Sequence, residues 1–165
     1  GVTQDYERAI EWYTKAAEKG NADAMYNLGC MYNIGRGVTQ DYERAIEWYT
    51  KAAEKGNADA MYLLGCMYNI GRGVTQDFAR AFEWHTKAAE KGNADAMHSL
   101  GLMYNYGVGV TQDYERAIEW YTKAAENGNA DAMDNLAEMY KKGQGVARDM
   151  QKADEWKRKA EVARR

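Results

Sequence analysis

Two cysteines and two histidines are the residues of this sequence best suited to chemistry, yet their spacing argues against it. Cys30 and Cys66 occupy the same position in consecutive copies of a repeated block. We therefore expect them about 8–10 Å apart, too far for an unstrained disulfide, as free thiols. His85 and His98 lie on different predicted helices, and this pair is not a zinc pattern. Because no Ser–His–Asp or Cys–His arrangement is evident, we predict that the chain is not an enzyme and holds no cofactor.

The elements that position these residues follow from a repeat with a period of 36 residues. The first two copies differ at one position, where Asn27 becomes Leu63, and the later copies diverge more. The copies start at residues 1, 37, 73, 109 and 145, and the fifth is incomplete. One such block cannot bury its apolar face alone, so the blocks must stack into a solenoid. A solenoid offers an extended surface, and this favours binding over catalysis.

Composition narrows the class of protein further. The chain is 45% hydrophobic and lacks proline, which favours a folded helical protein over a disordered one. Its net charge of −3 argues against a general nucleic-acid or membrane surface, which needs a basic stripe. No apolar run approaches the length of a membrane span. We therefore expect a protein or peptide partner, no nucleic-acid partner and no membrane insertion.

Each period contains two amphipathic helices. The shorter helix is predicted at about Ala22–Ile34 and the longer at about Asp41–Lys55, with Asn21 and Asp41 or Thr39 as N-caps. The buried stripe of the shorter helix is Ala24, Met25, Leu28, Met31 and Tyr32. That of the longer helix is Tyr42, Ala45, Ile46, Tyr49, Ala52 and Ala53. His85 takes the place of Tyr49 in a later copy, so we interpret it as a core residue.

Gly29 lies inside the buried stripe of the shorter helix. Glycine in a helix costs about 1 kcal/mol relative to alanine. We therefore expect a compensating close approach of a neighbouring helix at this position.

The repeated motif resembles the Sel1-like repeat family, whose members are related to tetratricopeptide repeats. The residues that carry the resemblance are Ala24, Leu28, Gly29, Tyr32, Gly35, Gly37, Val38, Asp41, Ala45, Trp48, Tyr49, Ala52, Ala53 and Gly56. The resemblance covers the whole chain. It implies an all-α fold, a right-handed α-solenoid of antiparallel helix pairs with nine helices in two layers. In the family's terms, the shorter helix is helix A and the longer one is helix B.

This family pattern predicts a single repeat domain over residues 1–165. An orphan helix B in residues 1–20, with the helix itself at about 5–19, precedes four A–B repeats at 21–56, 57–92, 93–128 and 129–164. The last repeat has Lys157 in place of the usual tyrosine and is more charged, so we interpret it as the C-terminal cap. The chain begins at Gly1 in mid-repeat, which we interpret as a piece of a longer protein. We expect a monomer, with end-to-end association at the N-terminus left open, and the cellular compartment stays open as well.

Differences between the copies indicate where recognition occurs. Positions 26, 30 and 34 of helix A vary between copies, share one face and avoid the core stripe. The resemblance implies that this face lines a concave surface that contacts a partner. Asn33, Asn69 and Asn105 form a ladder able to hydrogen-bond an extended peptide. The predicted groove consists of Asp23, Tyr26, Cys30, Asn33, Ile34, Asp59, Tyr62, Cys66, Asn69, Ile70, Asp95, His98, Leu102, Asn105, Tyr106, Asp134, Glu138, Lys141 and Lys142.

The sequence thus favours a protein–protein interaction scaffold or adaptor that presents helix A faces to a peptide or helix. Three alternatives stay open. One is an RNA-binding helical repeat, which the acidic net charge opposes. Another is a relative of the cysteine-rich β-lactam hydrolases, which carry paired cysteines that this chain lacks. The third is an engineered or idealised array without a native partner, suggested by the near-identical first copies.

Overall fold

A computed structural model describes residues 1–165 and consists of nine α-helices joined by short loops, with no strands. This confirms the predicted all-α fold class and number of helices. The helices are α1 (Val2–Glu18), α2 (Ala22–Ile34), α3 (Tyr42–Glu54), α4 (Ala58–Ile70), α5 (Phe78–Glu90), α6 (Ala94–Tyr106), α7 (Tyr114–Glu126), α8 (Ala130–Lys142) and α9 (Met150–Ala163). None of them combines the length and apolarity needed to cross a bilayer.

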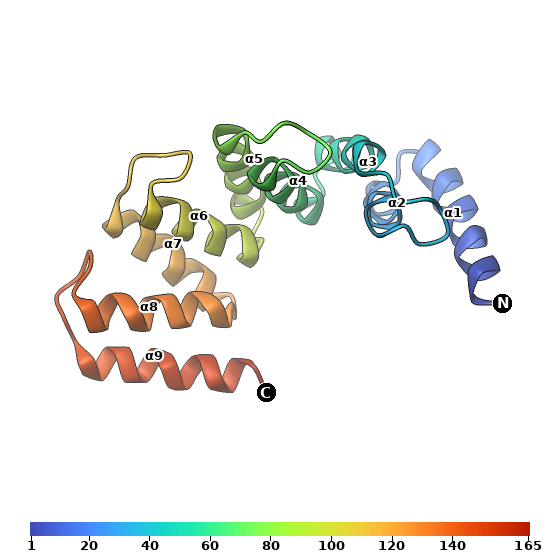
Figure 1. Ribbon diagram of the computed structural model, residues 1–165. Helices are drawn as coiled ribbons and strands as arrows, with labels where there is room; N and C mark the ends of the chain where they lie inside the picture. Colours follow the sequence, from blue (N-terminus) through green and yellow to red (C-terminus); the bar gives the residue numbers. More distant parts are fainter. The chain divides into compact units, whose positions relative to one another are not determined.

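The chain divides into two compact units, Gly1–Trp84 and His85–Arg165, with the boundary inside α5. In the first unit α1, α2, α3 and α4 pack in chain order, each against the next. In the second unit α6 packs against both α7 and α8, and α9 packs against α8. Figure 1 shows α8 and α9 lying side by side at the C-terminal end of the chain. Both units therefore consist of alternating A and B helices.

The short helices begin and end where the sequence predicts. Helix α2 spans Ala22–Ile34, and the Oδ1 atom of Asn21 accepts the backbone N–H of Ala24 at 2.9 Å. This bond satisfies one of the donors that a helix start leaves unpaired. Gly20 ends the preceding helix with a φ of 89°, a left-handed conformation that favours glycine.

The long helices are capped by aspartate. Asp41 Oδ1 accepts the backbone N–H of Arg44 at 3.0 Å, which selects Asp41 over Thr39 as the N-cap. Helix α1 is an exception, because it starts at Val2 and not near Asp5 as predicted. In the next copy the backbone N–H of Asp41 donates to Tyr32 O at 2.9 Å and so holds the loop outside the helix. Residues 1–165 include no helix A before α1 that could hold the equivalent residues in a loop, and in α1 these residues are helical.

The core joins the two helix types through leucine, methionine, alanine and tyrosine. Leu28 and Tyr49 are each 1% exposed, and the alanines of α3 are also buried. The predicted close approach at Gly29 is confirmed, because a Cβ placed there would lie 2.5 Å from the Cδ1 and Cε1 atoms of Tyr49. Gly101 meets the ring of Tyr121 in the same way in the second unit. The missing side chain therefore makes room for an aromatic ring of helix B.

Glycine also shapes the loop between helix A and helix B. Gly37 has a φ of 74°, and a Cβ there would lie 2.8 Å from Tyr6 Cβ and 2.9 Å from its backbone carbon. The Nε2 atom of Gln40 then donates to the Asn33 carbonyl at 2.8 Å. This hydrogen bond ties the loop to the end of α2, and the equivalent bonds of Gln76 and Gln112 do the same at α4 and α6.

Candidate partner-binding surface

In the first unit, the variable face of helix A is apolar and accessible. Ile34 and Ile70 are each 52% exposed, which is high for large aliphatic side chains at the end of a packed helix. Cys30 and Tyr26 lie one and two turns earlier on α2 and are half-buried. The remaining predicted residues of this unit, all half-buried or exposed, are Asp23, Asn33, Asp59, Tyr62, Cys66 and Asn69.

Tyr26, Cys30 and Tyr49 form a small cluster behind this face. The Tyr49 hydroxyl donates to Cys30 Sγ at 3.5 Å, and the rings of Tyr26 and Tyr49 are 6.0 Å apart. Burial raises the pKa of Tyr26 to about 12, helped by its interaction with Cys30. Burial raises the pKa of Tyr49 still further. Both phenols are therefore neutral at ordinary pH, and the cluster presents hydroxyl groups without charge.

Two aspartates of the predicted groove have structural partners. Asp23 Oδ1 accepts from Asn57 Nδ2 at 3.1 Å, and Asp95 Oδ1 accepts from Asn129 Nδ2 at 2.9 Å. Each of these asparagines is the N-cap of the following helix A. The aspartates therefore link successive short helices, in addition to any contact with a partner.

In the second unit the same face is more polar. His98 Nε2 and Asn135 Oδ1 are 2.7 Å apart and connect α6 to α8. The imidazole of His98 also lies 5.8 Å from the ring of Tyr121. Leu102 replaces the cysteine found in the earlier copies, and the buried Tyr121 hydroxyl has no hydrogen-bond partner. Thus the cysteine-to-leucine change coincides with an unpaired hydroxyl group.

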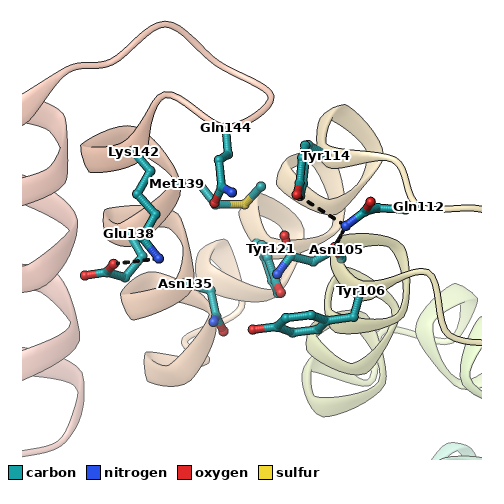
Figure 2. A pocket seen from close by; sticks show the side chains of 10 residues that line it. All are labelled: Asn105, Tyr106, Gln112, Tyr114, Tyr121, Asn135, Glu138, Met139, Lys142 and Gln144. Carbon is teal, nitrogen blue, oxygen red and sulfur yellow. Dashed lines mark hydrogen bonds and ion pairs between the residues drawn. The ribbon is translucent and has the colours of Figure 1, made fainter.

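A pocket of about 220 Å³ opens next to this hydroxyl. Figure 2 shows it between the end of α6, helix α8 and the loops that follow them. Glu138 and Lys142 form an ion pair of 3.4 Å along its wall, and the hydroxyl of Tyr106 points toward Asn135. The lining residues are Asn105, Tyr106, Gln112, Tyr114, Tyr121, Asn135, Glu138, Met139, Lys142 and Gln144. Most of these residues are polar, so the pocket differs in character from the apolar face of the first unit.

The pocket contains four residues of the predicted groove and six that the sequence analysis missed. The predicted ones are Asn105, Tyr106, Glu138 and Lys142. The missed ones include Asn135 and Gln144, which stand where an earlier copy has Leu63 and Arg72. These changes were visible in the repeat alignment, but the loop and helix B residues beside them are the same in most copies. Only the folded arrangement brings the changed and unchanged residues to one place.

The last predicted residues lie near the C-terminal helix. The guanidinium of Arg164 contacts both Asp131 and Asp134 at 2.7 Å, which ties the end of α9 to the start of α8. Asp134 is therefore engaged within the chain, whereas Lys141 is exposed. The contribution of Arg164 was missed because it lies outside the repeated motif.

His85 and the cysteines behave as the sequence predicts. His85 is 3% exposed, and burial lowers its pKa to about 4, so it is a neutral core residue. Cys30 and Cys66 are half-buried thiols that form no disulfide. No group of three or more histidine, cysteine, aspartate or glutamate side chains is placed to hold a metal ion.

Comparisons with known structures place this architecture among solenoid proteins. A protective antigen of uropathogenic Escherichia coli, c5321, displays an SLR fold and matches with a TM-score of 0.91 and 44% identity, over 93% of this chain and 33% of that one. A Sel1 repeat protein from Oxalobacter formigenes matches with a TM-score of 0.90 and 37% identity, over 94% of this chain and 62% of that one. The chain thus spans about a third of the length of the first relative and somewhat under two thirds of the length of the second.

A more distant match is cysteine-rich protein B of Helicobacter pylori, with a TM-score of 0.64 and 26% identity, over 80% of this chain and 95% of that one. No curated protein matches the chain. The two closer similarities confirm the predicted solenoid fold class.

The model of the Sel1 repeat matches five consecutive segments that together span nearly the whole chain. They are residues 1–21, 22–57, 58–93, 94–129 and 130–160. Their boundaries fall within one residue of the predicted repeat starts. Proteins built from these repeats are generally protein-interaction scaffolds and are typically not catalytic. The repeats, the helix pairs and the similar structures agree, and the chain belongs to the Sel1 repeat family.

Proposed function

We propose that this chain is an interaction scaffold whose helix A faces recognise a peptide segment or a helix of a partner protein. The observation that carries the proposal is the exposure of Ile34 and Ile70 at equivalent positions of α2 and α4, each 52% accessible. Neither residue is needed for the core of its helix pair. Exposed aliphatic side chains arranged in register favour an interaction site over an inert surface.

The same face accounts for the pattern of variation between copies. The core residue Leu28 recurs as leucine in all four short helices, whereas the accessible positions change from apolar to polar along the chain. A scaffold needs constant packing and variable contacts, so this division of roles supports recognition by helix A. The similarity to a cysteine-rich protein does not favour hydrolysis, because this chain has single cysteines in two copies and no pair within a repeat.

The proposal can be tested with a displayed peptide library selected against the full chain. The double variant Ile34→Ser with Ile70→Ser removes two apolar contacts and should leave the fold intact, because both side chains are half exposed. Fully burying one isoleucine contributes about 1.5–3 kcal/mol, so we expect selected peptides to lose at least about tenfold in affinity.

A matched control is Trp12→Ala on α1, which removes a side chain that is 72% exposed on a helix of the other type. This variant should bind the selected peptides with unchanged affinity. Unchanged binding by the isoleucine variant, or loss of binding by the Trp12 variant, would place recognition on a different surface. The monomeric state and the single-domain organisation stay predictions.

A further inference from the structure

The second unit contains two buried polar atoms without hydrogen-bond partners at one place. They are Asn105 Oδ1 and the Tyr121 hydroxyl, and both residues line the same pocket of about 220 Å³. Tyr121 is 0% exposed, so solvent at the surface does not hydrate its hydroxyl. Buried donors and acceptors are nearly always paired, and an exception calls for an explanation such as a missing ligand.

The first unit provides an internal reference for this pocket. Its equivalent residues stand two repeats earlier in the chain. Five are identical in the two units: Asn33, Gln40, Tyr42, Tyr49 and Met67 match Asn105, Gln112, Tyr114, Tyr121 and Met139. Five differ: Ile34, Leu63, Cys66, Ile70 and Arg72 are replaced by Tyr106, Asn135, Glu138, Lys142 and Gln144. Four of these replacements introduce a more polar side chain, so the pocket combines a constant frame with a new polar lining.

The same comparison explains the unpaired hydroxyl. In the first unit the Tyr49 hydroxyl donates to Cys30 Sγ at 3.5 Å. In the second unit Leu102 takes the place of Cys30, and leucine has no acceptor. The Tyr121 hydroxyl therefore lacks this acceptor, and Asn105 Oδ1 in the lining of the same pocket lacks a donor.

The charges of the lining select against an ionic ligand. Glu138 and Lys142 are the charged residues of the pocket, and they neutralise each other across 3.4 Å. The buried polar atoms of the lining that lack a partner are one hydroxyl group, which can donate, and one amide oxygen, which can accept. A neutral group with an acceptor atom and a donor atom bonded to the same carbon satisfies both atoms, and among protein side chains that group is the carboxamide of asparagine or glutamine.

We propose that this pocket of the second unit binds the carboxamide side chain of an asparagine or glutamine in a partner segment. The carboxamide oxygen accepts from the Tyr121 hydroxyl, and its NH₂ group donates to Asn105 Oδ1. The side chain of Tyr106 is 67% exposed, so it can rotate aside and admit the ligand to these two atoms. The assignment rests on the proposed use of helix A faces in recognition, and it names the residue type that one site would select.

The test is a titration of the full chain, followed by nuclear magnetic resonance of its side-chain amides. The probes are N-acetyl-glutamine N-methylamide and the corresponding leucine and glutamate compounds. We expect the glutamine probe to shift the Asn105 amide signals with a dissociation constant of about 1 mM, a value suited to a single contact group. The leucine and glutamate probes should leave these signals in place. Equal shifts from the leucine probe, or none from glutamine, would overturn the assignment.

Two variants decide whether the unpaired hydroxyl is responsible. Tyr121→Phe removes only the oxygen atom and should weaken binding of the glutamine probe about tenfold. Leu102→Cys restores the partner that Tyr49 has in the first unit and should weaken binding similarly; it decides the question if Tyr121→Phe misfolds. The matched control Tyr49→Phe should leave binding unchanged. Full binding by the Tyr121 or Leu102 variant would refute the role of the hydroxyl.

The outcome is separable from that of the isoleucine test. If peptides selected on the isoleucine face still depend on Ile34 and Ile70 while the glutamine probe fails to bind, only the pocket assignment is wrong. If the glutamine probe binds but selected peptides ignore the isoleucines, the scaffold proposal is wrong for the first unit and the pocket remains.

Discussion

The contact between Gly29 and Tyr49 leads to a quantitative prediction for Gly29→Ala. The new Cβ would lie 2.5 Å from two carbon atoms of the Tyr49 ring and 3.1 Å from a third. Carbon atoms prefer separations of about 3.5–4.0 Å, so the overlap is about 1 Å. The ring has little freedom to move, because it is 1% exposed and its hydroxyl is bonded to Cys30. The methyl group must therefore displace a helix or the ring.

Two opposing effects determine the size of the change. Overpacking a core costs about 1–3 kcal/mol, and the rigid ring places this site near the upper end. Replacing a helical glycine by alanine also stabilises the helix by about 1 kcal/mol, because alanine has the higher helix propensity. We therefore expect Gly29→Ala to lower the free energy of unfolding by about 2 kcal/mol. Urea unfolding followed by circular dichroism measures this difference.

The fourth copy supplies the control. Ala137 already occupies the position of Gly29, and Lys157, which is exposed, replaces the aromatic residue that would oppose it. Ala137→Gly should thus destabilise by about 1 kcal/mol, because it loses helix propensity and relieves no clash. In a Tyr49→Leu background, Gly29→Ala should become neutral or stabilising. If its cost persists there, or if Gly29→Ala stabilises the wild type, the argument from ring contact fails.

Three further predictions concern titration and capping. Burial lowers the pKa of His85 from about 6.5 to about 4, so the contribution of neutral His85 to the free energy of unfolding is fully present above pH 6.5 and is lost as the pH falls toward 4. The variant His85→Tyr should reduce this sensitivity to acid, as measured by urea unfolding at several pH values. The pKa of Tyr26 is raised from about 10 to about 12, so the free energy of unfolding should fall as the pH rises through that range. The variant Tyr26→Phe should lose less of this free energy, and absorbance at the phenolate band follows the ionisation itself. Asn57→Ala removes an N-cap and the bond to Asp23, and a cost of about 1 kcal/mol or more in urea unfolding is expected, against little change for Asn57→Ser.

The regular parts of the fold could be predicted from the sequence because local chemistry determines them. Helix α2 has the predicted bounds, since Asn21 caps its start and Gly35 follows its end with a φ of 67°. The buried role of His85 followed from its position on an apolar stripe. The start of α1 was misjudged, because the loop that delays the other long helices depends on contacts with a preceding helix A.

The candidate site was predictable only in part. The spacing of Tyr26, Cys30 and Ile34 predicts accessible side chains outside the core stripe; Ile34 is exposed, whereas Tyr26 and Cys30 are half-buried. The hydrogen bond between Tyr49 and Cys30 was not predictable, because both residues recur in the repeat and nothing in the period says which atoms meet. The pocket around Tyr121 was missed for the same reason, since the tyrosine that Tyr49 and Tyr121 share changes its hydrogen bonding when Cys30 is replaced by Leu102.

The double role of the N-cap asparagines has a consequence for how the array opens. Asn57 caps α4 through its oxygen while its nitrogen is bonded to Asp23 of α2, and Asn129 does the same for α8 and Asp95 of α6. When a short helix frays, the cap of the next one loses its anchor, so adjacent repeats share part of their opening free energy. Amide hydrogen exchange at the first turns of α4 and α8 should then report the integrity of the short helix that each is bonded to. Such nearest-neighbour coupling gives a repeat array cooperative behaviour over more than one repeat, although each individual contact is short-range.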